Sequence, residues 1–246
     1  MVDVINEALR IASNKKYNND VPLRYLEIGV HTGATFNNVV TKVSDREVIK
    51  EGVDPYGPFN GVHRMTSQMF FALNEYFWKK KYDVIFIDAM HFSPITNQEI
   101  DESLKILKEP GMLVLHDTMP PKESSGTVTA ESLVEYQKAV SNPLMQEYDP
   151  KDSYKYFTNF PGFPDVNGDC WKSVVRIRMS RPDVKVCSFD EPYRCTIVTR
   201  GTQPGGLLDP VEPDEIDWNF FTQKYSGILN IIDFSNFEKF VIKEVI

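Results

Sequence analysis

Acidic and histidine side chains follow two stretches of the sequence that have the pattern of buried strands. Asp88 ends the apolar run at 82–88 and His91 follows it, and His116 and Asp117 follow the apolar run at 112–115. If these strands are neighbours in one parallel sheet, about 4.8 Å apart, the four side chains converge at the edge where such sheets bind ligands. Carboxylates and imidazoles together can hold a divalent cation, and the same groups can act as a general base.

A glycine-containing turn follows the first expected strand. Gly29 and Gly33 flank His31, and Glu27 precedes them. The glycines lack a Cβ, so the turn can pass close to a ligand. A dinucleotide-binding loop would have a glycine where His31 stands, and Glu27 would lie near its pyrophosphate. The pattern therefore disfavours a nicotinamide dehydrogenase.

A second acid, Asp54, ends the next expected strand, where a carboxylate can accept hydrogen bonds from ribose hydroxyls. Together, Glu27 and Asp54 suit a ligand that carries an ammonium group and a ribose but no phosphate. S-adenosylmethionine fits that description. The structural alternative is that the glycines only make a strand-to-helix turn and that Glu27 is a solvated carboxylate.

The segments that must position these residues alternate between strand and helix patterns. This alternation predicts parallel βαβ units, and the runs 184–189 and 195–200 around the turn 190–193 predict an antiparallel hairpin. Expected strands are 23–28, a segment ending at 52–55, 82–88 and 112–115, and expected helices are 4–12, 34–43, 67–80, 95–107 and 171–179.

The composition predicts a soluble, cytoplasmic protein with one domain over 1–246. The formal net charge of −8 disfavours a nucleic-acid partner, and no segment approaches the roughly 20 apolar residues that cross a membrane. The N-terminus has no signal-peptide pattern, and an odd number of cysteines, three, fits a reducing compartment. Within this domain we expect an N-terminal helical segment (1–20), a lid rich in Pro, Tyr and Phe (143–166), and a C-terminal extension of unassigned role (201–246).

The glycine turn, Asp54 and the strand 82–88 resemble motifs of the class I S-adenosylmethionine-dependent methyltransferases, over roughly residues 23–200. The resemblance implies an α/β fold: a Rossmann-like, doubly wound, mostly parallel seven-stranded sheet with a C-terminal antiparallel hairpin. It also implies that S-adenosylmethionine is bound by Glu27, Gly29, His31, Gly33, Asp54 and Asp88.

The arrangement Asp-x-x-His after one strand and His-Asp after the next resembles a subgroup of these enzymes. It is also similar to the metal-dependent O-methyltransferases of sugar and macrolide tailoring. The resemblance implies Mg²⁺ or another divalent cation on Asp88, His116 and Asp117, with His91, His116 and Asp88 as catalytic residues. The sugar and macrolide enzymes generally have two acids where this chain has His116-Asp117, and Glu99 stands where the subgroup usually has Asp.

The expected function is therefore O-methylation of a hydroxylated small molecule such as a sugar or glycoside, with a homo-oligomer possible. A metal-dependent hydrolase or oxygenase could use the same four side chains, and a non-catalytic binding module could keep the fold alone. A structural role for His116 and Asp117, capping a strand and the following turn, also stays open. Asp169 is expected to cap the helix at 171–179, and Trp171 to lie in the core.

Overall fold

The fold is described from a computed structural model, which describes residues 1–14, 22–55, 60–128 and 167–242. The expected lid at 143–166 lies outside these residues. Four parallel strands form the centre of the sheet, and apolar side chains fill both of its faces because helices cover both. They are β1 (Leu23–Ile28), β3 (Arg46–Val53), β5 (Tyr82–Ile87) and β6 (Leu107–Leu115).

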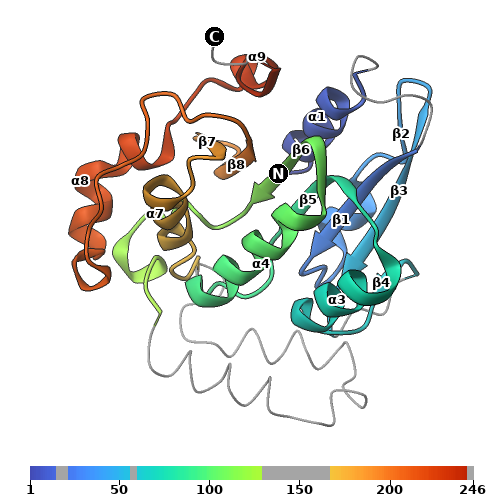
Figure 1. The fold of residues 1–246 in the computed structure, drawn as a ribbon, viewed down its shortest axis with the longest axis horizontal. Helices are drawn as coiled ribbons and strands as arrows, with labels where there is room; N and C mark the ends of the chain where they lie inside the picture. Colours follow the sequence, from blue (N-terminus) through green and yellow to red (C-terminus); the bar gives the residue numbers. More distant parts are fainter. Residues whose placement is uncertain (15–21, 56–59, 129–166, 243–246) are drawn as a thin grey trace.

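The strands run in the order β2-β3-β1-β5-β6-β8-β7 (Figure 1). Two-residue strands extend the β3 edge: β2 (Lys42–Val43) pairs antiparallel with β3, and β4 (Val62–His63) pairs parallel with it. At the other end, β7 (Val184–Phe189) and β8 (Cys195–Arg200) form an antiparallel pair next to β6. The predicted mostly parallel sheet with a C-terminal hairpin is confirmed, and β4 is an addition to the seven-strand path.

Helices cover the two faces of the sheet. One face packs against α3 (Ser67–Leu73), α4 (Ser93–Ile106), α7 (Trp171–Ser180) and α8 (Trp218–Leu229). The opposite face packs against α1 (Val2–Ala12), α2 (Ala34–Asn38) and α9 (Phe237–Ile242). In such doubly wound sheets, ligands generally bind at the carboxyl ends of the central strands.

The helix predicted at 34–43 is wrong beyond Asn38. Val39 has extended backbone angles, and the chain then forms β2, which turns back onto β3 as a short hairpin. The β-branched run Val39-Val40-Thr41 favours this extended path, since branching at Cβ restricts side-chain rotamers in a helix. The predicted helix at 67–80 is also modified, because α3 gives way to one π-helical segment at Asn74–Trp78.

The C-terminal extension packs against the sheet. Beyond α8, the chain passes along the outer side of β7, where Ser188 N donates to Asn230 O at 3.3 Å and Ile232 N donates to Ser188 O at 3.1 Å. Side chains occupy the outward groups of Val186: Gln203 Oε1 accepts from its N–H at 2.5 Å and Asn230 Nδ2 donates to its carbonyl at 2.8 Å. The outward backbone groups of Val186 and Ser188 are thus all hydrogen-bonded.

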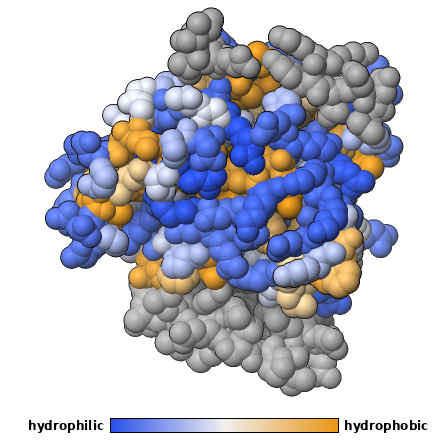
Figure 2. Space-filling model, viewed as in Figure 1, coloured by the Kyte–Doolittle hydropathy of each residue, from blue (hydrophilic) through white to orange (hydrophobic). Residues whose placement is uncertain are grey.

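Where Figure 2 colours this face of the molecule, hydrophilic residues predominate, and smaller groups of hydrophobic residues lie between them. Among the helices that the structure describes, none combines the length and the apolar character needed to cross a bilayer.

Gly29 directly follows β1 and lies against the backbone that follows β5. Its φ is +88°, and its N–H donates to Val53 O on β3 at 2.9 Å. A Cβ built on Gly29 would lie 2.1 Å from the carbonyl oxygen of Asp88. Only glycine fits this crossing, because both the positive φ and the close approach exclude a side chain.

We predict that Gly29→Ala lowers the free energy of unfolding by about 1–3 kcal/mol more than Gly205→Ala does, because only the former adds a steric clash. Gly205 is the matched control, since it also has a positive φ, +81°, but nothing lies within 4 Å of its added Cβ. Denaturant unfolding followed by circular dichroism measures both values, and equal losses would contradict the steric argument.

Candidate functional site

The turn after β1 brings its expected ligand-binding residues to the tips of two neighbouring strands. Gly29, His31 and Gly33 all have positive φ, at 88°, 47° and 78°, so the backbone curls tightly before α2 begins. Asp54, at the tip of β3, accepts a hydrogen bond from His31 N at 2.7 Å through Oδ2. The two acids flank one turn, since Glu27 pairs in register with Gly52, two residues before Asp54.

Glu27 is more enclosed than the sequence suggests. Its side chain is buried, with 1% of the residue exposed, and it accepts a hydrogen bond from Tyr25 Oη at 2.6 Å. Burial is the main reason that its pKa rises to about 8; the charge of Asp88 adds to the rise, and the Tyr25 hydrogen bond and Lys50 oppose it. The alternative of a solvated Glu27 is therefore wrong. The carboxyl is mostly neutral at pH 7, and a cation beside it would favour the ionised form.

Asp88, His91, His116 and Asp117 converge, as expected for the tips of the neighbouring strands β5 and β6. His116 Nδ1 lies 3.0 Å from Asp88 Oδ1 and 3.0 Å from Asp117 Oδ2. His91 Nε2 lies 2.9 Å from Asp117 Oδ2 and 3.6 Å from Asp88 Oδ1. One ligand atom from each of Asp88, His116 and Asp117 lies within 4.8 Å of the others, a spacing that one metal ion can bridge.

The charges in this cluster balance. Burial opposes the charge on His116, but hydrogen bonds to Asp117 and Asp88 outweigh it and raise the pKa of the imidazole to about 10. Burial is likewise outweighed at His91, whose pKa rises well above its ordinary value mainly through the charge of Asp117. The histidines in turn hold the pKa values of Asp88 and Asp117 below the usual range, against the effect of burial. Two cations and two anions therefore face one another at neutral pH.

Accessibility differs among the four side chains. His116, His91 and Asp88 keep 34%, 33% and 27% of their side-chain surface exposed, whereas Asp117 keeps 9%. The cluster thus opens to one side and rests on Asp117. A small ligand or cation can approach three of the four groups directly.

The segment before α7 packs closely against the loop that carries His91. A Cβ on Gly168 would lie 1.7 Å from the carbonyl oxygen of His91, and Gly168 has a φ of +60°. The expected role of Asp169 as a cap of α7 is wrong: its carboxylate accepts from Ser93 N at 2.6 Å and from Ser93 Oγ at 3.0 Å, at the start of α4. Trp171 is buried in the core, as predicted.

Glu99 lies on the buried side of α4, not in the cluster. Its Oε1 accepts from Ser67 Oγ at 2.7 Å, and its Oε2 is buried without a hydrogen-bond partner. Burial raises the pKa of Glu99 to about 7, against the Ser67 hydrogen bond and the charge of His91. Glu99 is therefore a buried acid whose pKa is affected by the charge of His91 in the cluster.

Sequence reasoning missed Asn167, whose Nδ2 donates to Asp117 Oδ1 at 2.6 Å. The two residues lie 50 positions apart, and no local pattern connects them. The only available signal was the Asn-Gly-Asp run itself, which the sequence favoured as the approach to a helix.

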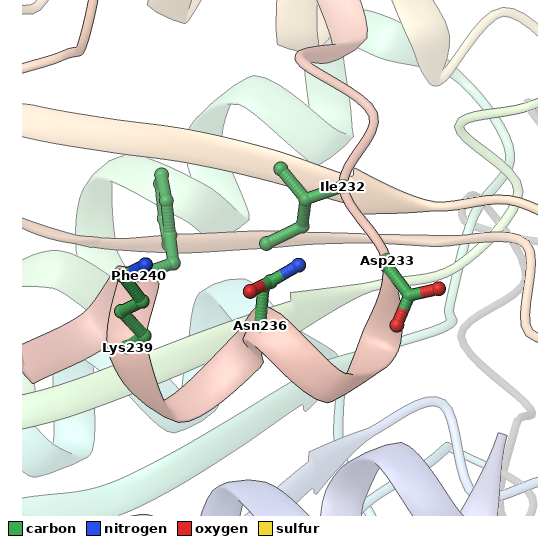
Figure 3. Close-up of a pocket in the computed structure, with 5 residues that line it drawn as sticks. All are labelled: Ile232, Asp233, Asn236, Lys239 and Phe240. Carbon is green, nitrogen blue, oxygen red and sulfur yellow. The ribbon is translucent and has the colours of Figure 1, made fainter.

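A separate hollow of about 330 Å³ lies by α9, in the C-terminal extension. Figure 3 shows Ile232, Asn236 and Phe240 pointing toward a common space, with Asp233 turned aside. Lys239 completes the lining, and none of the predicted site residues takes part. With one acid and one lysine and no cluster of titratable groups, this hollow offers no evident chemistry.

No family model matches the chain, and no curated protein is similar to it. Solved structures that match include an O-methyltransferase from Bacillus cereus in complex with SAH, at 12% identity over 80% of this chain and 90% of that one, with a TM-score of 0.39. The O-methyltransferase TomG from Streptomyces achromogenes, in complex with SAM, matches at 10% identity over 82% of this chain and 79% of that one, with a TM-score of 0.42.

A third match is the MycE methyltransferase of the mycinamycin biosynthetic pathway, in complex with Mg and SAH. It has 10% identity over 91% of this chain and a TM-score of 0.40, and this chain spans 55% of its length. Identities this low, with TM-scores below 0.5, carry no functional argument. The chemistry of the site has to be judged from the chain's own residues.

Proposed function

We propose that this protein is an S-adenosylmethionine-dependent methyltransferase that methylates a hydroxyl of a small molecule such as a sugar, assisted by Mg²⁺ or another divalent cation. One observation carries the proposal. Four adjacent parallel strands, β3, β1, β5 and β6, present an acid-flanked glycine turn and a carboxylate–histidine cluster at the same edge of the sheet. Methyl transfer needs a donor site and an acceptor site side by side, and we assign the turn to the donor and the cluster to the acceptor.

The glycine turn fits the donor. When bound, S-adenosylmethionine supplies a methyl group on a positively charged sulfur. Glu27 would face its amino-acid end, because a buried carboxyl with a pKa of about 8 gains charge stabilisation from a nearby ammonium group. Asp54 would accept from the ribose, and Gly29, His31 and Gly33 would line the cofactor with backbone. Asp88 links the turn to the cluster, because its backbone carbonyl lies against Gly29 and its carboxylate belongs to the cluster.

The carboxylate–histidine cluster fits the acceptor. Asp88, Asp117 and His116 would hold a divalent cation, whose role when bound is to lower the pKa of an acceptor hydroxyl and orient it. Carboxylate oxygens suit Mg²⁺ and Mn²⁺, whereas an imidazole ligand suits Zn²⁺, Fe²⁺ or a similar ion. His91, whose Nε2 lies 2.9 Å from Asp117 Oδ2, carries a proton at neutral pH because its pKa is raised. It would accept the hydroxyl proton only after losing its own, which a cation bound to Asp117 would favour.

The cluster would also suit a metal-dependent hydrolase or oxygenase, because its four side chains could bind a metal ion without any contribution from the glycine turn. That function leaves Glu27 and Asp54 without a ligand. It requires metal binding in the absence of cofactor binding, so the two measurements below separate the functions.

We predict that the wild-type protein binds S-adenosylhomocysteine in isothermal titration calorimetry and that Asp54→Asn weakens binding about 10–100-fold. The substitution removes a charged acceptor, and a hydrogen bond to a charged group contributes about 1.5–3 kcal/mol. Asp209→Asn, at an exposed position far along the chain, is the control and should bind like wild type. No binding by the wild type would remove the cofactor from the proposal, and an unchanged Asp54→Asn would remove Asp54 from the site.

We also predict that Mn²⁺ affinity rises by up to about tenfold for each pH unit between about pH 6 and pH 8, with proton release on binding. The reason is that His116, with a pKa of about 10, carries a proton over this range, and a metal ligand atom must be unprotonated. Calorimetry in two buffers of different ionisation enthalpy counts the protons. His116→Asn should flatten the dependence, and a wild-type affinity that ignores pH would contradict His116 as a ligand.

A further inference from the structure

Asn167 reaches the carboxylate–histidine cluster from a different part of the chain than its other members. It lies just before α7, beyond the strands β5 and β6 that carry the acids and histidines. Its amide donates from Nδ2 to Oδ1 of Asp117 at 2.6 Å, a short contact for such a hydrogen bond.

The two oxygens of Asp117 have different partners. Oδ1 accepts a hydrogen bond from Asn167 Nδ2. Oδ2 faces the cluster, 2.9 Å from His91 Nε2 and 3.0 Å from His116 Nδ1. Holding one oxygen fixes the rotation of the carboxylate group and therefore the direction of the other.

Asn167 is itself held on both sides. Its N–H donates to Ser125 O at 2.9 Å, which attaches it to the segment after β6. The next residue, Gly168, packs against the His91 carbonyl so closely that no Cβ fits, and Asp169 caps the start of α4. The backbone that carries the Asn167 amide is thus held on both sides, as expected of a group that orients a ligand.

We propose that Asn167 is a positioning residue for divalent-cation binding: it holds Asp117 so that Oδ2 faces the cation shared with Asp88 and His116. This inference rests on the cation part of the proposed function. Partners that orient metal ligands typically change metal affinity 10–100-fold when they are removed. Asn167 touches the cation only through Asp117, so its loss should leave cofactor binding intact.

The test compares Asn167→Ala and Asn167→Leu with wild type and with Asn97→Ala. The leucine fills the space of the amide but cannot donate, which separates the hydrogen bond from a cavity effect. Asn97 is the control, because its side chain also takes part in a hydrogen bond, as acceptor from Arg176 Nε on α7 at 2.9 Å, and its carbonyl likewise accepts from Arg176 and not from the cluster. Free Mn²⁺ is measured by electron paramagnetic resonance, S-adenosylhomocysteine binding by calorimetry, and folding by thermal denaturation without metal.

We expect both Asn167 variants to bind Mn²⁺ about 10–100-fold more weakly, with S-adenosylhomocysteine affinity and the Asn97→Ala control unchanged. Wild-type Mn²⁺ affinity in folded Asn167 variants would overturn the inference while leaving the methyltransferase proposal in place. A wild-type protein that binds S-adenosylhomocysteine but no Mn²⁺ would overturn the inference and the cation part together. A wild-type protein that binds no S-adenosylhomocysteine would overturn the methyltransferase proposal alone, and the Mn²⁺ comparison would still decide the role of Asn167.

Discussion

The backbone crossing of Gly29 and Asp88 is the constraint on which the site depends. Parallel pairing of β1 with β5 brings the ends of both strands to one edge, and the missing Cβ at Gly29 lets the turn after β1 lie directly against the Asp88 carbonyl. The glycine turn and the carboxylate–histidine cluster are adjacent because of this contact. A bulkier residue would push the two halves of the site apart, whatever the chemistry of their side chains.

Charge balance governs the second half of the site. Two carboxylates held close together in a folded protein would repel each other, and each would lose part of its hydration. His91 and His116 offset this cost by carrying protons, as their raised pKa values show. A divalent cation would supply the same positive charge in less space. The histidines therefore keep the acids ionised and close together.

Local patterns in the sequence predicted the parts of the structure that depend on neighbours in the chain. Continuous apolar runs gave β1, β5 and the β7–β8 hairpin within a residue, because strands buried on both faces need such runs. Strand ends then placed Asp88 and Asp117 together. The predicted helix after Gly33 is too long, because Val39 to Thr41 are branched at Cβ and favour extended structure.

Contacts between distant segments could not be predicted in the same way. Asp169 caps α4 across 76 residues and Asn167 orients Asp117 across 50, and both depend on how α7 packs against α4. The enclosure of Glu27 likewise requires the three-dimensional packing around Tyr25, whereas its place at the strand tip follows from the sequence alone.

The chain that runs beside β7 has a consequence for self-association. An exposed strand edge offers rows of unpaired amides and carbonyls, and another molecule can add a strand to it. Here Gln203, Asn230 and the backbone of 230–232 already occupy the outward positions at Val186 and Ser188. A strand from a second copy therefore finds no unpaired backbone group at those two positions, and β-augmentation there would first have to displace the chain's own C-terminal extension.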